Sequence, residues 1–213
     1  MLTGLVLVLF AYVLGSVPWG VVIAKKACGI DPRTAGSHSI GATNISRLCG
    51  FGWGVATLFC DVFKGSLPVY LALQSGAGPF LVSLVGLCAV LGHVFSCFLH
   101  FRGGKAVATT IGVFLPLAFL PLLGSAVLCL LLIWLSGFVS LGSLTLVSSL
   151  PLFLVFSGQS TWLALSLALC LLVFFKHREN IVRLHAGTEK SWLKSRHQEN
   201  PSDRPESGQQ DKK

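Results

Sequence analysis

The segment from residue 106 to residue 175 covers 70 positions without one charged residue. Basic residues flank both ends, so the positive-inside rule places both ends on the cytoplasmic side and requires an even number of crossings between them. Two crossings would leave about 30 apolar residues unplaced, whereas four would use about 17–18 residues each, near the ~20 that span a hydrocarbon core. Helix breakers at 116–124, 137–142 and 157–159 mark three turns. The segment therefore predicts four transmembrane helices.

Three further apolar segments precede it, at residues 2–24, 51–74 and 80–98. The chain is thus predicted to be an all-α integral membrane protein with seven transmembrane helices and polar loops at the cytoplasmic side. Its composition, 53% hydrophobic and 11% charged, is typical of a membrane protein and not of a soluble one. Lys25 and Lys26 follow the first segment, and no positive charge precedes it. We therefore expect an anchored first helix with its N-terminus outside, and no cleaved signal peptide.

Residues 1–194 are predicted to form one membrane domain. Residues 195–213, rich in Ser, Gln, Pro, Asp and Lys, are predicted to be a disordered polar tail. The seven cysteines show no CxxC pair and no metal-ligand spacing, so we expect neither a disulfide nor a metal. The net charge of +8 is concentrated at a few points along the chain. We expect contact with the lipid bilayer, no nucleic-acid partner and no obligate protein partner.

Polar residues interrupt the apolar pattern in three clusters, which the predicted topology places at one membrane face. The first cluster occupies residues 31–47, where glycines permit close backbone approach to a ligand and arginines offer forked donors for phosphate. Its candidate ligand-binding residues are Gly36, Ser37, Thr43, Asn44 and Arg47. An ordinary membrane connector, whose arginines obey the positive-inside rule, is the alternative interpretation.

The second cluster combines His93 with the sequence Gly103-Gly104-Lys105 ahead of a helix-forming run. Flexible backbone N–H groups, a lysine and a helix N-terminus are typical of a phosphate cradle. The spacing is not that of a P-loop, and a capped start of a membrane helix explains the pattern nearly as well.

The third cluster follows the last predicted span. His177, Asn180 and Arg183 fall about one helical turn apart and so share a face, close to Glu179 and Glu189 in the sequence. A solvated juxtamembrane helix with routine basic anchors is the alternative.

Asp61 and Lys64 lie inside the second predicted span, at a spacing that puts them on one helical face. Each charge costs about 2.5–3.5 kcal/mol at the centre of a bilayer, so both should face protein or a wet cavity. Two interpretations stay open: an internal ion pair that locks helix packing, or a ligand-facing role for Lys64.

The order of these motifs resembles the bacterial acyl-phosphate:glycerol-3-phosphate acyltransferase family of the PlsY type. The resemblance runs from residue 15 to residue 189. It is carried by Gly36-Ser37 with Ile40-Gly41-Ala42-Thr43-Asn44 and Arg47, by Asp61-Val62-Phe63-Lys64-Gly65, by Gly92-His93 with Phe101-Arg102-Gly103-Gly104-Lys105, and by His177 with Glu179-Asn180, Arg183-Leu184 and Gly187-Thr188-Glu189.

The resemblance implies seven transmembrane helices in the bacterial cytoplasmic (inner) membrane, with the active site facing the cytoplasm. It implies acyl transfer from acyl phosphate to glycerol 3-phosphate, giving lysophosphatidic acid and phosphate, without a cofactor or metal. The implied catalytic residues are Ser37, Arg47, Lys105, His177 and Asn180. The implied substrate-binding residues are Gly36, Thr43, Asn44, Lys64, His93, Gly103, Gly104 and Arg183. Asp61 and Glu189 are expected to be structural.

The chain departs from the family pattern at two places. His38-Ser39 stands where the family usually has Gly-Asn, and Ala106 follows Gly-Gly-Lys where glycine is usual. Histidine adopts left-handed backbone geometry more readily than most residues, so we expect the first loop to keep its shape.

Two other function classes fit part of the sequence. A membrane transporter of an anionic phosphorylated metabolite would also use basic clusters and glycine-broken helices, but its polar residues should gather at the midplane and not at one face. A purely structural membrane protein would have little use for three separate glycine-rich polar clusters.

Overall fold

The computed structural model of the protein describes residues 2–192, and the predicted tail at 195–213 lies outside them. The described residues are helical and contain no strand. The elements are α1 (Leu2–Ser16), α2 (Trp19–Cys28), α3 (Ala42–Cys49), α4 (Phe51–Gln74), α5 (Pro79–Val94), η1 (Cys97–Leu99), α6 (Val107–Leu117), α7 (Phe119–Ser136), α8 (Val139–Phe156), η2 (Ser160–Trp162), α9 (Leu163–Lys176) and α10 (Arg178–His185). The predicted all-α class is confirmed.

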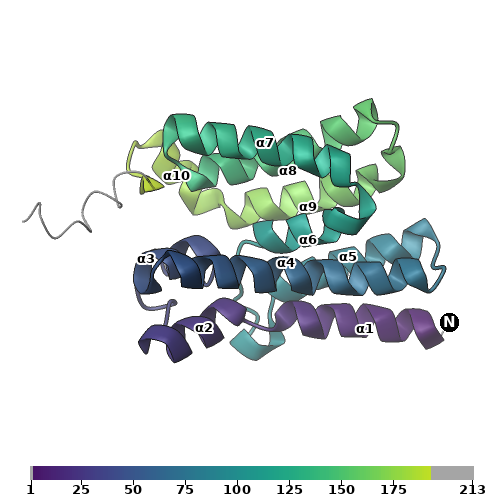
Figure 1. The fold of residues 1–213 in the computed structure, drawn as a ribbon, viewed down its shortest axis with the longest axis horizontal. Helices are drawn as coiled ribbons and strands as arrows, with labels where there is room; N and C mark the ends of the chain where they lie inside the picture. The colour runs from purple at the N-terminus through teal and green to yellow at the C-terminus, as the bar shows by residue number, and fades with distance from the viewer. Residues whose placement is uncertain (1, 193–213) are drawn as a thin grey trace, which may run out of the picture.

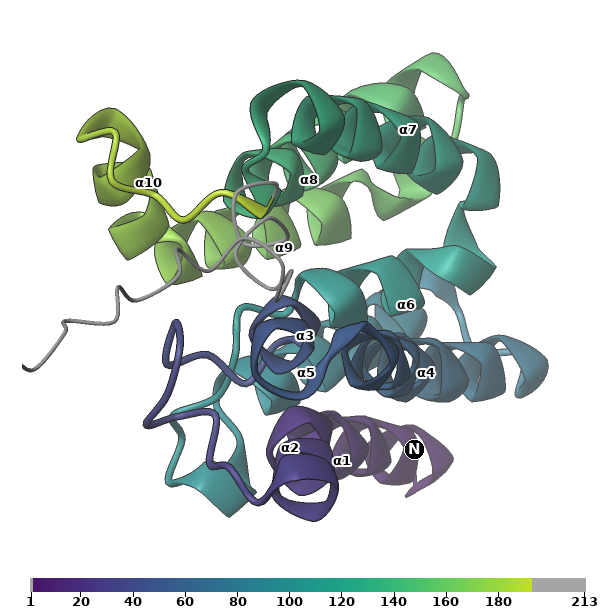
Figure 2. The ribbon, with the colours of Figure 1, turned by 60° about the vertical axis from the view of Figure 1, so that its left-hand side comes forward.

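The helices form two groups that pack side by side (Figures 1 and 2): α1 to α6 in one group, and α7 to α10 in the other. One hydrophobic core joins them, because buried residues of both groups belong to the same cluster, among them Val85 on α5, Phe114 on α6, Leu150 on α8 and Leu169 on α9. Many large apolar side chains remain exposed on the outer surface, such as Phe80 and Leu171. That distribution suits a surface that contacts lipid, and the chain is a multi-pass membrane protein.

Five helical segments in the described part of the chain are long and apolar enough to cross a membrane, or six if the bent pair formed by α9 and α10 counts as one span. The shorter apolar helix α6 has 11 residues. The expected count of seven is therefore not exact by length and composition. The four helices predicted between residues 106 and 175 are present as α6 to α9, and they are separated at the predicted breaks.

The first span is broken between α1 and α2, at Val17 and Pro18. The break leaves backbone carbonyls without helical partners, and two side chains from other helices bind them. Lys64 Nζ donates to the Val17 carbonyl at 2.9 Å, and Ser96 Oγ donates to the Ser16 carbonyl at 2.6 Å. These bonds satisfy the carbonyls inside the bundle, where an unpaired polar group would be costly.

Glycines set the distance between the helices that carry the site. A Cβ added to Gly15 would lie 2.1 Å from the Ala89 carbonyl oxygen, so α1 and α5 pack backbone to backbone. Likewise, a Cβ on Gly65 would lie 2.3 Å from the Thr109 carbonyl oxygen, which brings α4 against α6. Close approach through small residues is the usual basis of helix packing in membranes. It holds the polar ends of these helices close together.

Cys28 at the end of α2 and Cys49 at the end of α3 form a disulfide. The expectation of no disulfide is therefore wrong for this pair. The two residues are 21 positions apart and have no motif spacing, so only the packing of α2 against α3 brings their sulfur atoms together.

Candidate active site

The polar clusters meet at the end of the bundle opposite the N-terminus, where α2, α3 and α10 lie (Figure 1). Lys105 precedes α6, Arg47 belongs to α3, and Asn180 belongs to α10. The structure thus brings together residues from all three predicted clusters, as the family pattern implies.

A chain of hydrogen bonds forms the centre of this site. Lys105 Nζ donates to Asn180 Oδ1 at 2.5 Å, and Asn180 Nδ2 donates to Glu189 Oε1 at 2.6 Å. The other oxygen of that carboxylate, Oε2, accepts from Arg183 Nε at 2.7 Å. Because Glu189 fixes both Asn180 and Arg183, its expected structural role agrees with its position.

The segment that follows Glu189 links this chain to the first loop. Arg47 Nη2 donates to the Lys190 carbonyl at 3.3 Å, and Lys190 Nζ donates to the Gly36 carbonyl at 3.2 Å. The Trp192 N–H donates to the Gly137 carbonyl at 2.7 Å, at the turn between α7 and α8. Segment 189–192 therefore joins the two helix groups across the site.

Asn44 organises the loop that carries Ser37. Its buried side chain accepts the Ser37 N–H at Oδ1, at 2.8 Å, and its Nδ2 lies within hydrogen-bond distance of the carbonyls of Pro32, Ala35 and Ser39. The amide is thus engaged with the loop backbone, and its position favours loop support over direct substrate contact. Gly36 is left-handed, with φ of 66°, and a Cβ there would lie 2.3 Å from Asn44 Oδ1.

The departures from the family pattern keep glycine-like geometry. His38 has φ of 53° and Ala106 has φ of 62°, both in the left-handed region. His38 thus adopts the left-handed geometry on which the expectation for this loop rests. On α3, Thr43 and Arg47 are one turn apart and share a face beside this loop.

His177 is buried at the bend of 61° between α9 and α10. Its Nδ1 lies 2.9 Å from the Val173 carbonyl, which can only accept a hydrogen bond, so Nδ1 carries the hydrogen. Nε2 of the neutral ring is then the nitrogen that can accept one. Lys105 and Glu189 are close enough to His177 to interact with it electrostatically.

Gly103 and Gly104 do not form the predicted phosphate cradle. The Gly103 N–H donates to the Val94 carbonyl at 3.0 Å, and the Gly104 N–H donates to the His93 carbonyl at 3.1 Å. Because both N–H groups bind the end of α5, this part of the expectation is corrected: the two glycines dock the loop on α5, and phosphate binding by Lys105 stays a prediction.

Asp61, Lys64 and His93 are buried inside the bundle, where His93 lies against the glycines that precede Lys105. Lys64 Nζ pairs with Asp61 Oδ1 at 2.8 Å, and His93 Nδ1 lies 3.7 Å from the same oxygen. These contacts favour the ion-pair interpretation of Lys64. Direct substrate binding by Lys64 and His93 stays a prediction without a supporting contact.

Charges in the site act on one another. Burial lowers the pKa of Lys105, and Arg183 adds to that shift while Glu189 opposes it. Burial acts to raise the pKa of Glu189, but hydrogen bonds from Arg183 and Asn180 outweigh it and leave the pKa below its usual value. Burial also lowers the pKa of Arg47, again against the attraction of Glu189. The site is a partly dehydrated basic cluster in which the carboxylates of Glu189 and Glu179 both act on Lys105. Within residues 2–192, no group of three His, Cys, Asp or Glu side chains is arranged to hold a metal ion.

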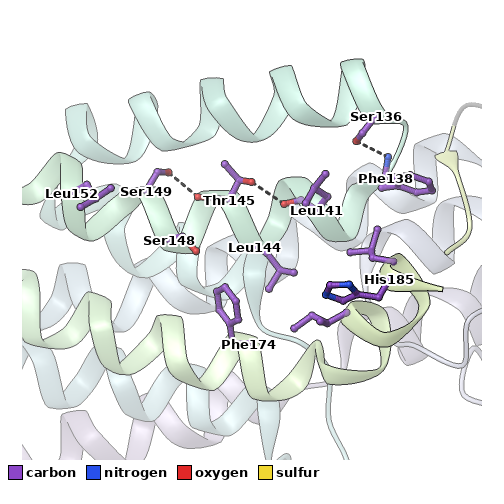
Figure 3. Close-up of a pocket in the computed structure, with 12 residues that line it drawn as sticks. Ser136, Phe138, Leu141, Leu144, Thr145, Ser148, Ser149, Leu152, Phe174 and His185 are labelled. Carbon is purple, nitrogen blue, oxygen red and sulfur yellow. Dashed lines mark hydrogen bonds between the residues drawn. The ribbon is translucent and has the colours of Figure 1, made fainter. Parts of the chain in front are cut away.

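An apolar groove of about 760 Å³ opens beside the site, between α8 and the α9–α10 bend (Figure 3). Leu144 of α8 and Phe174 of α9 lie near each other in it, and Ile181 and Leu184 of α10 also line it. Three hydroxyls that line the groove bond to the backbone of their own helix: Ser136 Oγ to the Leu132 carbonyl, Thr145 Oγ1 to the Leu141 carbonyl and Ser149 Oγ to the Thr145 carbonyl. The rest of the lining is mostly apolar, with Ser148 and His185 as its other polar side chains.

Sequence reasoning missed the backbone of Lys190, the Gly137 carbonyl and this groove. No residue type marks a backbone acceptor, and the groove is formed by apolar residues that resemble every other part of the spans.

The relationship to known proteins agrees with this arrangement. The sequence profile of the family described as glycerol-3-phosphate acyltransferase matches residues 5–187. A protein of Desulfovibrio desulfuricans with the same name is 69% identical over 186 residues, which cover 87% of this chain and 83% of that protein. The chain belongs to the glycerol-3-phosphate acyltransferase family.

Two crystal structures of a member of this family, PlsY, share the fold. The glycerol 3-phosphate form of that integral membrane enzyme is 37% identical, with a TM-score of 0.88, and the alignment covers 93% of this chain and all of the other. Its lysophosphatidic acid form is 38% identical, with a TM-score of 0.84, and covers 92% of this chain and 99% of the other. This acyltransferase-family chain therefore has the PlsY architecture.

Proposed function

We propose that the protein transfers an acyl group from acyl phosphate to glycerol 3-phosphate, giving lysophosphatidic acid and phosphate. The observation that carries the proposal is the convergence of Arg47, Lys105 and Arg183 around the Asn180–Glu189 pair, next to an apolar groove. Relatives with the acyltransferase name, and PlsY structures described as glycerol 3-phosphate and lysophosphatidic acid forms, support the acceptor and the product.

The cations would bind the two phosphate groups of the donor and the acceptor. Two phosphates held close together repel each other, and arginine and lysine reduce that repulsion by charge-assisted hydrogen bonds. Burial strengthens such interactions because water screens them less. The separation of the cations over α3, the loop before α6, and α10 suits two anionic groups better than one.

The proposed reaction is a direct transfer. The acceptor hydroxyl oxygen bonds to the acyl carbonyl carbon and loses its proton, the bond from that carbon to the phosphate oxygen breaks, and the phosphate leaves carrying that proton. Acyl phosphate is already activated, so positioning and charge stabilisation can supply much of the rate. No hydrogen bond joins Ser37 Oγ to a histidine within residues 2–192, which supports a ligand-binding role for Ser37 over a nucleophilic one.

The groove would hold the acyl chain. Its lining residues on α8 extend from Leu141 to Leu152, which is about 16 Å along a helix axis. That length is close to half of a hydrocarbon core of about 30 Å, the depth of one leaflet. Asn180 and Ile181 are adjacent in the chain, so the groove ends where the phosphate site begins. An acyl phosphate would then lie with its chain in the bilayer and its phosphate at Lys105.

We also propose that this end of the bundle faces the cytoplasm in a bacterial inner membrane, because Lys25, Lys26, Arg47 and Arg102 all follow or precede spans on that side. The transporter alternative is less well supported, since the described polar residues of the site gather at one end of the bundle.

The decisive experiment supplies the purified protein with radiolabelled glycerol 3-phosphate and a choice of donor. We expect lysophosphatidic acid and an equal amount of phosphate with palmitoyl phosphate, and no product with palmitoyl-CoA. Product formation from the thioester alone would overturn the proposed donor, and no product from either would overturn the proposed function.

A further inference from the structure

The ring of His93 lies between a buried ion pair and the backbone that carries Lys105. On one side, His93 Nδ1 faces Asp61 Oδ1 at 3.7 Å, and that oxygen pairs with Lys64 Nζ at 2.8 Å. All three side chains are 3% exposed or less. Within residues 2–192, His93 Nδ1 has no hydrogen-bond partner, and Asp61 Oδ1 at 3.7 Å lies beyond hydrogen-bond distance but within ion-pair distance of it.

On its other side, the ring supports Gly104. A Cβ added to Gly104 would lie 2.3 Å from His93 Nε2, so the glycine backbone rests directly on the edge of the ring. The Gly104 N–H also donates to the backbone carbonyl of His93 at 3.1 Å. Lys105 is the next residue, and its Nζ reaches Asn180 Oδ1. The position of the His93 ring therefore limits where the Lys105 backbone can lie.

The ion pair itself is anchored on a third helix. Lys64 Nζ donates to the Val17 carbonyl at the α1–α2 break. A buried ion pair is weak support for stability, because the loss of hydration offsets much of the attraction. The position of the ion pair matters more than its energy. The pair lies next to the His93 ring, and through this ring it links the α1–α2 break, α4 and α5 to the loop before α6.

We propose that His93 is a positioning residue for Lys105: its ring, packed between Asp61 and Gly104, holds the Gly103–Gly104 backbone in the position from which Lys105 reaches the substrate phosphate. This role rests on the proposed function for its effect on catalysis, but the positioning is measurable without catalysis. It replaces direct substrate contact as the role of His93.

Hydrogen exchange of the purified protein tests the positioning directly. We expect His93→Ala to increase amide exchange at Gly103, Gly104 and Lys105, while exchange in the middle of α8 and α9 stays unchanged. Val90→Ala, a substitution of a fully buried residue one turn earlier on α5, is the matched control and should leave the loop amides protected. Unchanged protection of the loop in His93→Ala would overturn the proposal, whatever reaction the protein catalyses.

A double-mutant cycle tests the catalytic consequence. A displacement of about 1 Å can cost about 100-fold in rate, so we expect His93→Ala to lower kcat/KM by about that factor in the wild-type background. Because the effect passes through Lys105, His93→Ala should change activity by less than about 2-fold when Lys105 is already alanine. The same loss in both backgrounds would show a general structural effect and would overturn the positioning role.

A conservative variant tests whether an aromatic ring at this position is enough to support the loop. His93→Phe keeps a ring beneath Gly104, and we expect it to restore most of the loop protection that His93→Ala loses. Loop exchange as fast as in His93→Ala would contradict support by the ring. Absence of acyl transfer in the wild-type protein would count against the proposed function alone, since the exchange measurement still decides whether His93 positions the loop.

Discussion

Lys105 Nζ and Asn180 Oδ1 are 2.5 Å apart, although 75 positions separate the two residues in the chain. This hydrogen bond joins the loop before α6 to α10, and so connects the two helix groups at the site. It keeps Lys105 extended toward the Asn180–Glu189–Arg183 chain in the absence of substrate. A lysine held in this way is pre-organised for an anionic ligand, which lowers the entropic cost of binding it.

The first prediction concerns the phosphate-binding cations. Arg47→Ala and Lys105→Ala should each lower acyltransferase activity by about one to three orders of magnitude, because each removes a charge that stabilises phosphate in the transition state. Initial rates with purified protein and both substrates varied give kcat and KM for each variant.

The control for these variants is Lys26→Ala, which removes an exposed positive charge at the end of α2. We expect wild-type kinetics from it and normal membrane levels of all three proteins. Near-normal kinetics in both site variants would instead support the view that these cations only orient the chain in the membrane.

The second prediction concerns pH. Burial lowers the pKa of Lys105 from its ordinary value of 10.5. The charged form exists below the pKa, so activity that needs the charge is present at lower pH and is lost as pH rises through the lowered value. The profile of kcat/KM against pH should therefore fall on its alkaline side below pH 10.5. In Lys105→Arg, which stays protonated, the residual activity should persist to higher pH. Identical alkaline limbs in the two proteins would rule out Lys105 as the titrating group.

The fold was largely predictable because its pattern is carried by long apolar runs. The span predicted at residues 51–74 corresponds to α4, Phe51–Gln74, and the three breaks predicted after residue 106 separate α6 to α9. Glycine and proline end helices through their own backbone conformation, so these helix breaks can be placed from a single sequence. The predicted length of α6 was wrong: the helix has 11 residues and not about 17–18, because it ends next to Pro116, at the start of the predicted break, and the apolar residues are not divided equally among the four helices.

The site was predictable as a set of residues but not as a set of contacts. Arg47, Lys105 and Asn180 do come together in the fold. They could be predicted as site residues because both their chemistry and the family pattern mark them. The Gly103 and Gly104 N–H groups turn toward α5, and Cys28 pairs with Cys49, because tertiary packing decides both. Lys64 carries a charge that suggests a ligand, yet its partner Asp61 and the Val17 carbonyl are revealed only by the folded helices.

The third prediction tests the membrane orientation. In a variant without the native cysteines, Ser75→Cys at the end of α4 should react in intact cells with a membrane-impermeant maleimide. Lys26→Cys should react only after permeabilisation, because the positive-inside rule places it in the cytoplasm. Labelling of both positions from one side would contradict the predicted crossing by residues 51–74, provided that the cysteine-free protein still has activity.

The fourth prediction separates the two interpretations of Lys64. Lys64→Ala leaves Asp61 buried without its partner and should destabilise the protein by about 3–5 kcal/mol. Replacing both residues, with Asp61→Asn and Lys64→Met, removes both charges and should recover most of that loss. Thermal unfolding in detergent, followed by tryptophan fluorescence, measures both. A stable Lys64→Ala protein with a raised KM for glycerol 3-phosphate would favour the ligand-facing interpretation instead.

The last prediction concerns the backbone at His38, which is exposed and has φ of 53°. A residue with a Cβ pays about 1–2 kcal/mol in this region, and β-branched residues are disfavoured further, whereas glycine is unstrained. His38→Gly should therefore keep wild-type activity and melting temperature, while His38→Val should lower both. Because the side chain is exposed, the difference between the two variants reports backbone strain and not packing. Thr34→Val, in the same loop but outside the left-handed region, is the β-branched control: it removes only the exposed hydrogen bond from Thr34 Oγ1 to the Asp31 carbonyl and should cost less than His38→Val. Equal melting temperatures for His38→Gly and His38→Val would show that the loop does not hold residue 38 left-handed, and that Ser37 is positioned by Asn44 alone.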